Sequence, residues 1–499
     1  MTTTVAAVDL GAESGRVATV SFDGAKLDLK VHHRFANTPA VRDGYLRWDV
    51  RTLWSQIQHG LGGLAAGDTD IAAVGVDTWG VDYGLIGPSG ELLDDPICYR
   101  DDRNGVSYHR ALEIMDPADL YDATGIQIMQ INSLFGLMAD VREQPDRLDK
   151  AQTMLMIPDV FHHLLSGSTV TEYTGASTTA AFDMATGTWA TGLLDTLGVP
   201  THMLPEVVAP GTDVGSVIGD LGRGRLAGSR VIMPPGHDTA SAVVAVPFAH
   251  PSGLFISSGT WSLAGVELPH AVITPATRMA NLTNEGGYGG TIRLLRNVMG
   301  LWILQECRRQ WAREGVELTY AELADLAAAE PAAVSLINPD LSDFLAPGDM
   351  PNRIREYCAV RGEVVPQTIG QVARCVVDSL ALSYRATVND IGNATGVRPP
   401  TVNIVGGGSN HALLSQMTAD ACGIEVHCGP VEATALGNAA VQFAALGELS
   451  SLAEIREVIA ATSEITVYQP NSTDLWDEAA VRFAALVNQD RTATGLGGH

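Results

Sequence analysis

Two strand-turn-strand patterns with glycine- and serine-rich tips constrain the fold of this chain more than any other feature. In residues 5–22 a short β-rich run passes through the turn 11–15 and resumes as a second β-rich run. Residues 253–266 repeat the pattern around the turn Ser257–Thr260. Because one copy opens each half of the chain, we predict a duplicated architecture with a boundary near residues 247–253.

The direct return of the first strand argues against one class of nucleotide-binding protein. In a dinucleotide-binding fold, a helix follows the glycine-rich turn and receives the pyrophosphate at its amino end. A strand follows here, so an NAD-dependent oxidoreductase is not expected. The chain also lacks a Gly-Lys-Ser/Thr sequence, which excludes a Walker-type phosphate loop.

The length of the chain, 499 residues, exceeds what one hydrophobic core usually organises. We therefore predict two α/β domains, residues 1–247 and 248–499, with a binding site in the cleft between them. Hydrophobic residues make up 46% of the chain and charged residues 18%. That composition is typical of a well-packed globular enzyme rather than of a disordered chain.

The charge balance limits the partners of the protein. With 31 basic and 57 acidic residues, the formal net charge is −26, so binding to nucleic acid or to an anionic membrane is not expected. An anionic substrate would need local amides, a few arginines or a metal ion, which favours magnesium. The six cysteines are scattered singly, and no run of 18 apolar residues occurs, so we predict a reduced, cytoplasmic protein.

The first turn offers a place for phosphate groups. Asp9 ends a predicted strand, and small residues follow it through the turn to Arg16. Backbone amides in such a turn can approach phosphate oxygens, and the carboxylate can reach a magnesium ion directly or through water. The alternative is an ordinary tight hairpin, and this sequence alone does not decide between the two.

A second glycine-rich element lies late in the chain. The predicted strand 402–405 leads into Gly406–Asn410, and a helix is predicted over 412–422. The glycines would let a nucleotide lie against the backbone while the amino end of the helix favours negative charge. Alternatively, Ser409 or Asn410 simply caps the helix. Three glycine elements in this order favour the nucleotide interpretation.

Two further segments are candidates for the acceptor side of a site. The loop 234–241 follows a predicted strand, and the carboxylate of Asp238 could take a proton from a sugar hydroxyl. Its alternative role is to cap the helix that follows. Residues 71–86 form another strand-turn-strand pattern, whose tip combines aromatic, glycine and carboxylate side chains. Trp79 and Tyr83 in it could bind a sugar or could belong to the core.

Taken together, these segments resemble the FGGY family of carbohydrate kinases over nearly the whole chain. The resemblance rests on the stretches DLGAESGRV, GVDTWGVDYGL, YRDDR, TGIQ, IPDVFHHLLSG, TEYTGASTT, PPGHDTASAV, ISSGTWSL, NEGGYGGTIRLLRNVMGLWILQECRRQW and NIVGGGSNHALLSQMTADACGI. It implies a duplicated, two-domain actin-like (ribonuclease H-like) α/β fold with ATP and sugar between the domains. It also implies transfer of the γ-phosphate of MgATP to a small ketose, L-rhamnulose in the first place.

The resemblance also assigns roles to individual residues. Asp238 would be the catalytic proton acceptor, and Asp9 would lie near the magnesium ion, possibly through water. The implied ATP-binding residues are Ala12, Glu13, Ser14, Gly15, Arg16, Thr260, Gln305 and Gly407. The implied sugar-binding residues are Gly80, His237, Asp238, Thr239 and Asn297.

Two departures from the family pattern concern the nucleotide. Glu13 places a carboxylate in the phosphate loop, where many relatives carry a small polar residue, so its side chain points away or helps to hold the metal. Residues 409–411, Ser-Asn-His, replace the Cys or Ser followed by Gln-Asn of relatives. Fine details of the nucleotide contacts are therefore open.

Two alternatives stay open at this point. The same chemistry could act on another ketose or a polyol, such as L-fuculose or D-xylulose, because the ATP motifs say little about the acceptor. The protein could also be a non-catalytic ATP-binding actin-like module, although a nucleotide switch needs no acceptor carboxylate such as Asp238. The oligomeric state does not follow from the sequence.

Overall fold

The computed structural model of the protein describes residues 2–471 and 474–493, and these form two compact units. Of the described residues, the first unit contains 2–247, 267–294 and 432–463, and the second contains 248–266, 295–431, 464–471 and 474–493. One unit boundary therefore coincides with the predicted division after residue 247. Two later segments, 267–294 and 432–463, nevertheless pack in the first unit. None of the described helices is both long and apolar enough to cross a membrane.

A six-stranded sheet forms the centre of the first unit, in the order β13-β14-β6-β1-β2-β3. Three consecutive strands make an antiparallel meander, and two later strands extend the sheet in parallel on the other side of β1. Their bounds are Thr3–Leu10 (β1), Ser14–Phe22 (β2), Leu27–Ala36 (β3), Ala73–Thr78 (β6) and Arg230–Met233 (β14), with Thr212–Ser216 (β13) at the edge.

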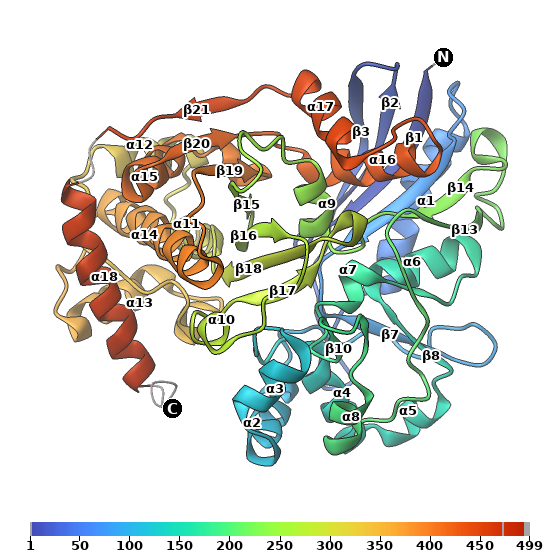
Figure 1. The fold of residues 1–499 in the computed structure, drawn as a ribbon, viewed down its shortest axis with the longest axis horizontal. Helices are drawn as coiled ribbons and strands as arrows, with labels where there is room; N and C mark the ends of the chain where they lie inside the picture. Colours follow the sequence, from blue (N-terminus) through green and yellow to red (C-terminus); the bar gives the residue numbers. More distant parts are fainter. Residues whose placement is uncertain (1, 472–473, 494–499) are drawn as a thin grey trace. The chain divides into compact units, whose positions relative to one another are not determined.

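Helices cover both faces of this sheet (Figure 1). Helices α1 (Val50–Ala65) and α6 (Ile157–Ser166) bury Val74 and Val76 of β6 on one face. Gly75 points to the opposite face, where α16 (Ala433–Ala445) lies so close that a Cβ at Gly75 would come within 2.8 Å of the Asn438 side chain. Successive side chains of β6 thus point to opposite faces of the sheet, and each face is covered by its own helices.

The rest of the first unit consists of short elements around this core. The strands are Ala40–Arg42 (β4), Tyr45–Arg47 (β5), Tyr83–Ile86 (β7), Thr153–Met156 (β8), Thr171–Glu172 (β9), Phe182–Asp183 (β10), Thr188–Trp189 (β11), Val207–Val208 (β12) and Thr283–Gly286 (β17). The helices are Arg103–Ile114 (α2), Pro117–Thr124 (α3), Ser133–Glu143 (α4), Pro145–Lys150 (α5), Tyr173–Ala176 (α7), Thr191–Thr196 (α8), Asp238–Val244 (α9), Pro275–Met279 (α10) and Leu452–Thr462 (α17), with 3-10 turns at Gly224–Leu226 and Tyr288–Gly290.

The second sheet repeats the strand plan of the first, in the order β17-β18-β16-β15-β19-β20-β21. Its central strand β15 pairs antiparallel with β16 and parallel with β19, which in turn pairs parallel with β20. This is the arrangement of β1 with β2, β6 and β14, so the predicted duplication is confirmed. The bounds are Leu254–Ser258 (β15), Ser262–Leu268 (β16), Ile292–Val298 (β18), Thr401–Val405 (β19), Glu425–Cys428 (β20) and Thr466–Tyr468 (β21).

The helices of the second unit centre on the long helix α14, which packs against α12 and α15. A hydrogen bond of 2.7 Å between Tyr384 of α14 and Ser262 of β16 ties this helix to the sheet. The helices are Trp302–Arg313 (α11), Tyr320–Ala328 (α12), Met350–Arg361 (α13), Ile369–Thr395 (α14), Ala412–Cys422 (α15) and Asp474–Ala493 (α18), with 3-10 turns at Ser342–Phe344 and Gly407–Asn410.

One expectation about local structure was wrong. Residues 71–86 do contain two strands, but they do not form a strand-turn-strand unit. β7 pairs antiparallel with β8 in a separate two-stranded sheet, whereas β6 pairs with β1 and β14. The chain therefore leaves the main sheet between β6 and β7, and Val81 in this stretch takes a positive φ of 65°.

Gly437 of α16 gives a test of how closely this helix packs on α9. A Cβ at Gly437 would lie 1.8 Å from the backbone oxygen of Ser241 in α9. We expect Gly437→Ala to destabilise the protein by about 1–3 kcal/mol, because a backbone atom cannot move aside as a flexible side chain can. Gly63→Ala in α1 is the control, since a Cβ there meets no atom within 4 Å. Thermal unfolding that shifts equally for both variants would contradict the close packing of α16 on α9.

Candidate active site

The turn between β1 and β2 exposes the predicted phosphate loop. Gly11 donates its amide to the Ser14 oxygen at 2.8 Å, and Asn37 closes the turn from β3 by donating to the backbone oxygens of Gly11 and Glu13, both at 2.9 Å. Ala12 and Glu13 are half-buried and Ser14 is exposed. Gly15, by contrast, is buried, and a Cβ there would lie 2.4 Å from the Phe35 ring. Residues 11–14 therefore form the accessible part of the predicted loop.

Arg16 is held by carboxylates of its own unit. Its Nε lies 3.3 Å from Oδ2 of Asp9, and its Nη1 contacts Glu432, whose other oxygen lies 2.8 Å from Nη2 of Arg34. Glu432 comes from a segment far along the chain, just before α16, and no motif or pattern singled it out. The predicted contact of Arg16 with ATP phosphates stays a prediction, and the guanidinium is already positioned beside Asp9.

Two buried aspartates stand side by side on the first sheet. Asp9 of β1 and Asp77 of β6 are partners in the parallel register. Burial raises the pKa of Asp9 to about 6, Arg16 opposes the shift, and Asp238 adds to it. Burial also raises the pKa of Asp77, with Asp9 adding to the shift, while Asn438 donates to its Oδ2 at 2.6 Å. Burial and repulsion from neighbouring carboxylates thus disfavour the charged forms of both aspartates, and a cation at this end of the sheet would stabilise them.

Asp9 has the features that a divalent cation would need. Its Oδ2 is buried and has no hydrogen-bond partner among the described residues. The described part of the chain contains no group of three or more His, Cys, Asp or Glu side chains placed to hold a metal ion. Magnesium bound with a nucleotide needs only one or two carboxylates in addition to the phosphates. The carboxylate of Asp9 therefore fits a cation that arrives with a nucleotide.

In the loop after β6, the buried carboxylate of Asp82 accepts hydrogen bonds from two tryptophan side chains. The indole nitrogens of Trp48 and Trp79 both donate to Oδ2 of Asp82, at 2.6 and 2.9 Å, and their rings lie 4.3 Å apart. Burial raises the pKa of Asp82 to about 7. Trp79 and Tyr83 are each 6% exposed, and the Tyr83 hydroxyl donates to Asp140. The core interpretation of these two aromatic residues is therefore the correct one.

Gly80 lies at the tip of that loop. A Cβ at Gly80 would lie 3.1 Å from Thr178, and the next residue, Val81, donates its amide to the Thr178 hydroxyl at 2.9 Å. The positive φ of Val81 is costly for a β-branched residue, and such strain is commonly found at ligand sites. Thr178 thus holds the backbone of this loop through its hydrogen bond with Val81 and its close packing on Gly80.

The loop 234–238 meets the end of β6. The Thr78 amide donates to the Gly236 oxygen at 2.9 Å, and Thr78 forms a parallel bridge with His237. Since Gly80 follows Thr78 by two residues, the structure brings three predicted sugar-side elements together: the Gly80 loop, His237 and Asp238. The sequence predicted these residues but not the backbone contact that joins them.

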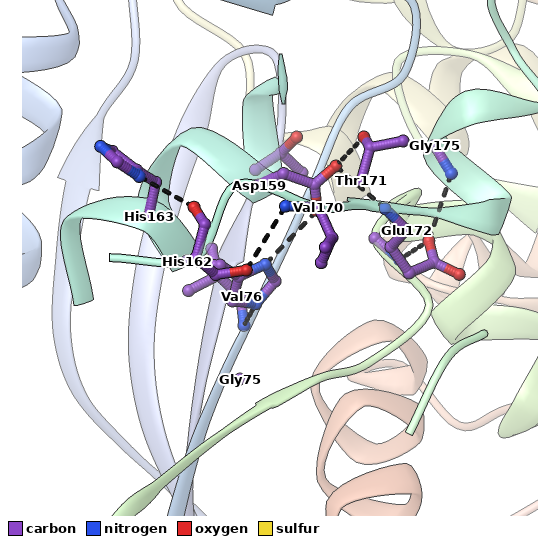
Figure 2. A network of polar contacts seen from close by, with 12 residues as sticks. Gly75, Val76, Asp159, His162, His163, Val170, Thr171, Glu172 and Gly175 are labelled. Carbon is purple, nitrogen blue, oxygen red and sulfur yellow. Dashed lines mark hydrogen bonds and ion pairs between the residues drawn. The ribbon is translucent and has the colours of Figure 1, made fainter. Parts of the chain in front are cut away.

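The buried carboxylate of Glu172 holds the same loop through hydrogen bonds. Its Oε2 accepts hydrogen bonds from the Gly236 amide at 2.7 Å and from the Thr174 hydroxyl at 2.5 Å, and Thr174 in turn accepts from the His237 amide at 3.1 Å. Burial raises the pKa of Glu172 to about 7. Figure 2 shows how Asp159 anchors Glu172 by accepting from its backbone amide and from Thr171. Sequence reasoning missed Glu172, although it lies in the TEYT stretch of the family pattern.

Asp238 is the first residue of α9, and His237 occupies the N-cap position without a capping side-chain bond. Oδ1 of Asp238 accepts from the amide and hydroxyl of Thr239, at 2.5 and 3.2 Å. Burial raises the pKa of Asp238, and His237 opposes the shift. A carboxylate with a raised pKa at the edge of a loop is suited to accept a proton near neutral pH.

In the second unit, the turn between β15 and β16 is joined to the start of α11. The amides of Leu301 and Trp302 donate to the oxygens of Gly259 and Thr260, at 3.2 and 3.1 Å. Gln305 lies one turn further along α11, and its Oε1 is buried without a hydrogen-bond partner in the described residues. Thr260 and Gln305, both predicted to bind ATP, therefore belong to one local structure.

The glycine loop after β19 packs on the same turn. A Cβ at Gly408 would lie 2.0 Å from the Ser258 hydroxyl, so only glycine fits there, whereas a Cβ at Gly407 meets nothing within 4 Å. The alternative role of Ser409 or Asn410 as the cap of α15 does not hold. A 3-10 turn intervenes, and His411 caps the helix by accepting from the Leu414 amide at 3.2 Å.

The predicted site residues thus divide between the two units. Thr260, Gln305, Gly407 and the half-buried Asn297 of β18 lie in the second unit, and the others lie in the first. In the first unit the predicted residues lie at the turn after β1 and at the end of β6, and in the second unit Thr260 and Gln305 lie at the turn after β15 and the start of α11. The binding roles themselves stay predictions.

Family models match both halves of the chain. The N-terminal domain of the FGGY family of carbohydrate kinases matches residues 4–245, and the C-terminal domain of that family matches residues 254–446. The chain belongs to the FGGY family of carbohydrate kinases. As a member of this family it is a sugar kinase, which implies ATP, a sugar and a divalent metal as its reactants and cofactor.

Individual relatives of this carbohydrate kinase extend over nearly its full length. A rhamnulokinase of Bacteroides thetaiotaomicron is 40% identical over 483 residues, covering 96% of this chain and 99% of the relative. A rhamnulokinase of Pectobacterium atrosepticum is 41% identical over 493 residues, covering 98% and 97%. The fold is similar to that of a gluconate kinase from Lactobacillus acidophilus, with a TM-score of 0.80 at 18% identity over 99% and 98% of the two chains. This last comparison confirms the predicted two-domain α/β fold.

Proposed function

We propose that this carbohydrate kinase transfers the γ-phosphate of ATP to the 1-hydroxyl of L-rhamnulose, giving L-rhamnulose 1-phosphate and ADP. The observation that carries the proposal is its likeness to rhamnulokinases, at 40–41% identity over 96–98% of the chain. The first unit supports it, because His237, Asp238 and the Gly80 loop meet there through the contact of Thr78 with Gly236.

Asp238 is the residue that would take the proton from the sugar hydroxyl. As the hydroxyl oxygen bonds to the γ-phosphorus, the bond from that phosphorus to the β-phosphate bridging oxygen breaks and ADP leaves. The hydroxyl proton passes to the Asp238 carboxylate. Most of the rate enhancement in such a reaction comes from alignment of the reactants and stabilisation of charge, with the carboxylate acting late.

The phosphate groups would be held by backbone amides of residues 12–14 and by the turn that carries Thr260, with Gly407 giving the nucleotide access to the backbone. Asp9 would hold magnesium, directly or through water, at its buried Oδ2, which accepts no hydrogen bond among the described residues and lies 3.3 Å from Nε of Arg16. Bound magnesium neutralises charge on the phosphate oxygens. Arg16 would keep Asp9 in place through their 3.3 Å contact.

The test is ADP release by the purified protein with MgATP and a panel of L-rhamnulose, L-fuculose, D-xylulose, L-ribulose and glycerol. We expect turnover on L-rhamnulose with kcat/KM at least tenfold above that on the other acceptors. Preference for another sugar would retain the chemistry and replace the substrate. Protection against thermal unfolding by MgATP without turnover on any acceptor would favour a non-catalytic ATP-binding module.

A cytoplasmic location and the lack of a nucleic-acid partner also remain predictions. They rest on the net charge of −26 and on the scattered cysteines. Fractionation of the cells that produce the protein, with detection by antibody, would test the location. The panel assay does not depend on either prediction.

A further inference from the structure

The imidazole of His237 is contacted by charged groups at both of its nitrogens. Nδ1 lies 3.2 Å from Oε2 of Glu285 and 3.3 Å from Nη2 of Arg293. Nε2 lies 3.5 Å from Oδ1 of Asp238. The ring is only 8% exposed, so these three groups define its electrostatic surroundings within the first unit.

Glu285 and Arg293 form a buried ion pair, and a backbone contact fixes the orientation of the guanidinium group. Nη2 of Arg293 lies 3.2 Å from Oε2 of Glu285, and Nε of Arg293 donates to the Gly286 oxygen at 2.8 Å. Burial opposes ionisation of Glu285, but His237 and Arg293 outweigh it and lower the pKa of this carboxyl. Glu285 is therefore ionised at neutral pH, and the guanidinium of Arg293 is fixed against it.

These contacts determine where the ring carries hydrogen. In a neutral ring, Nδ1 either accepts from Arg293 with the hydrogen on Nε2, or donates to Glu285 and leaves Nε2 without a hydrogen. A cationic ring donates from Nδ1 to Glu285 and also carries a hydrogen on Nε2. The remaining form, with hydrogen on Nδ1 alone, would direct the Nε2 lone pair at the carboxylate of Asp238. Both favourable forms thus present an Nε2–H to Asp238.

The hydrogen on Nε2 of His237 faces Oδ1 of Asp238, the oxygen that lies 3.5 Å from Nε2. Oδ1 already accepts from the amide and hydroxyl of Thr239. We propose that Arg293 and Glu285 are positioning residues, which orient His237 so that its Nε2–H faces Oδ1 of Asp238 and leaves Oδ2 as the atom that accepts the sugar proton. This inference rests on the proposed function, because it assigns atoms within the same reaction.

The proton balance of the step is simple. The hydroxyl proton of the sugar moves to Oδ2 of Asp238 as the new O–P bond forms and the bond to ADP breaks. The protonation state of His237 does not change in this step, and Glu285 and Arg293 exchange no proton. Their role is to fix the carboxylate plane so that Oδ2 points at the hydroxyl.

Glu285→Gln is the variant that tests the positioning role by kinetics. We expect kcat to fall about tenfold to 100-fold with little change in the KM for ATP, because a misplacement of about 1 Å in the reacting groups can cost ~10²-fold. Glu267→Gln is the matched control, since Glu267 is a largely buried carboxylate of the same unit whose ion pair is with Arg456, and it acts on Arg293 only through its charge. We expect the control to keep kcat within about twofold of the unmodified protein, because the geometry at His237 is unchanged.

A double-mutant cycle separates positioning from general destabilisation. In an Asp238→Asn background there is no carboxylate to orient, so Glu285→Gln should change the residual rate by less than about twofold. An equal loss in both backgrounds would contradict the proposal, and so would a loss equal to that of Glu267→Gln. Arg293→Lys should lower kcat as Glu285→Gln does if both residues act through the ring.

A second measurement does not depend on activity. In protein labelled with ¹⁵N-histidine, the signals of His237, assigned by their loss in His237→Gln, should show hydrogen on Nε2. A ring with hydrogen on Nδ1 alone would overturn the inference. If the unmodified protein phosphorylates no sugar, the proposed function fails, and the ring signals still decide whether Arg293 and Glu285 set the position of the hydrogen.

Discussion

Replacement of Asp238 by Asn is expected to lower kcat for sugar phosphorylation by about 10²- to 10⁴-fold, the usual contribution of a positioned proton acceptor. The amide oxygen of Asn can still accept the two bonds from Thr239 that hold Asp238. The loop therefore keeps its support, while the group that takes the proton is lost. Steady-state ADP release with L-rhamnulose and saturating MgATP is the measurement.

Two controls make this result specific to Asp238. MgATP should protect Asp238→Asn against thermal unfolding as well as it protects the unmodified protein, because phosphate binding does not need a proton acceptor. Asp146→Asn, at an exposed aspartate in the first turn of α5, should keep full activity. Retention of more than about a tenth of kcat in Asp238→Asn would mean that another group accepts the proton.

Removal of Asp140 is expected to have the largest effect on stability. Asp140 is fully buried and accepts from Arg103 at 2.6 Å, from Arg147 at 3.1 Å and from the Tyr83 hydroxyl at 2.6 Å. Asp140→Ala would leave two buried guanidinium groups without this counter-charge. We expect a loss of about 3–5 kcal/mol in the free energy of unfolding, measured by urea unfolding.

An exposed ion pair of the same unit provides the comparison. Arg110 and Glu113 lie 2.8 Å apart on α2 with side chains that are each 65% exposed. Glu113→Ala should change stability by less than about 0.5 kcal/mol, because water screens such a pair. Similar losses for Asp140→Ala and Glu113→Ala would show that burial does not govern the strength of the Asp140 cluster.

The local elements of the site followed from the sequence. The two hairpins that begin at β1 and β15 rest on short β-rich runs and on turns of small residues, and both signals act between residues close in the chain. The strand, glycine turn and helix over 401–422 were predictable for the same reason. The family motifs then identified Asp238 and His237, because their neighbours in the chain carry the pattern.

The repeated strand plan and the identity of the motif residues could therefore be predicted from the amino-acid sequence. The distant groups that surround these residues became known only from the folded chain. Examples are Glu432 on Arg16, Asn438 on Asp77, Glu285 on His237 and the pairing of β7 with β8 instead of β6. Such contacts join residues that are far apart in the chain, and no periodicity or turn signal encodes them. They form because burial leaves each charged or polar group few partners, and the packed chain alone determines which partner is within reach.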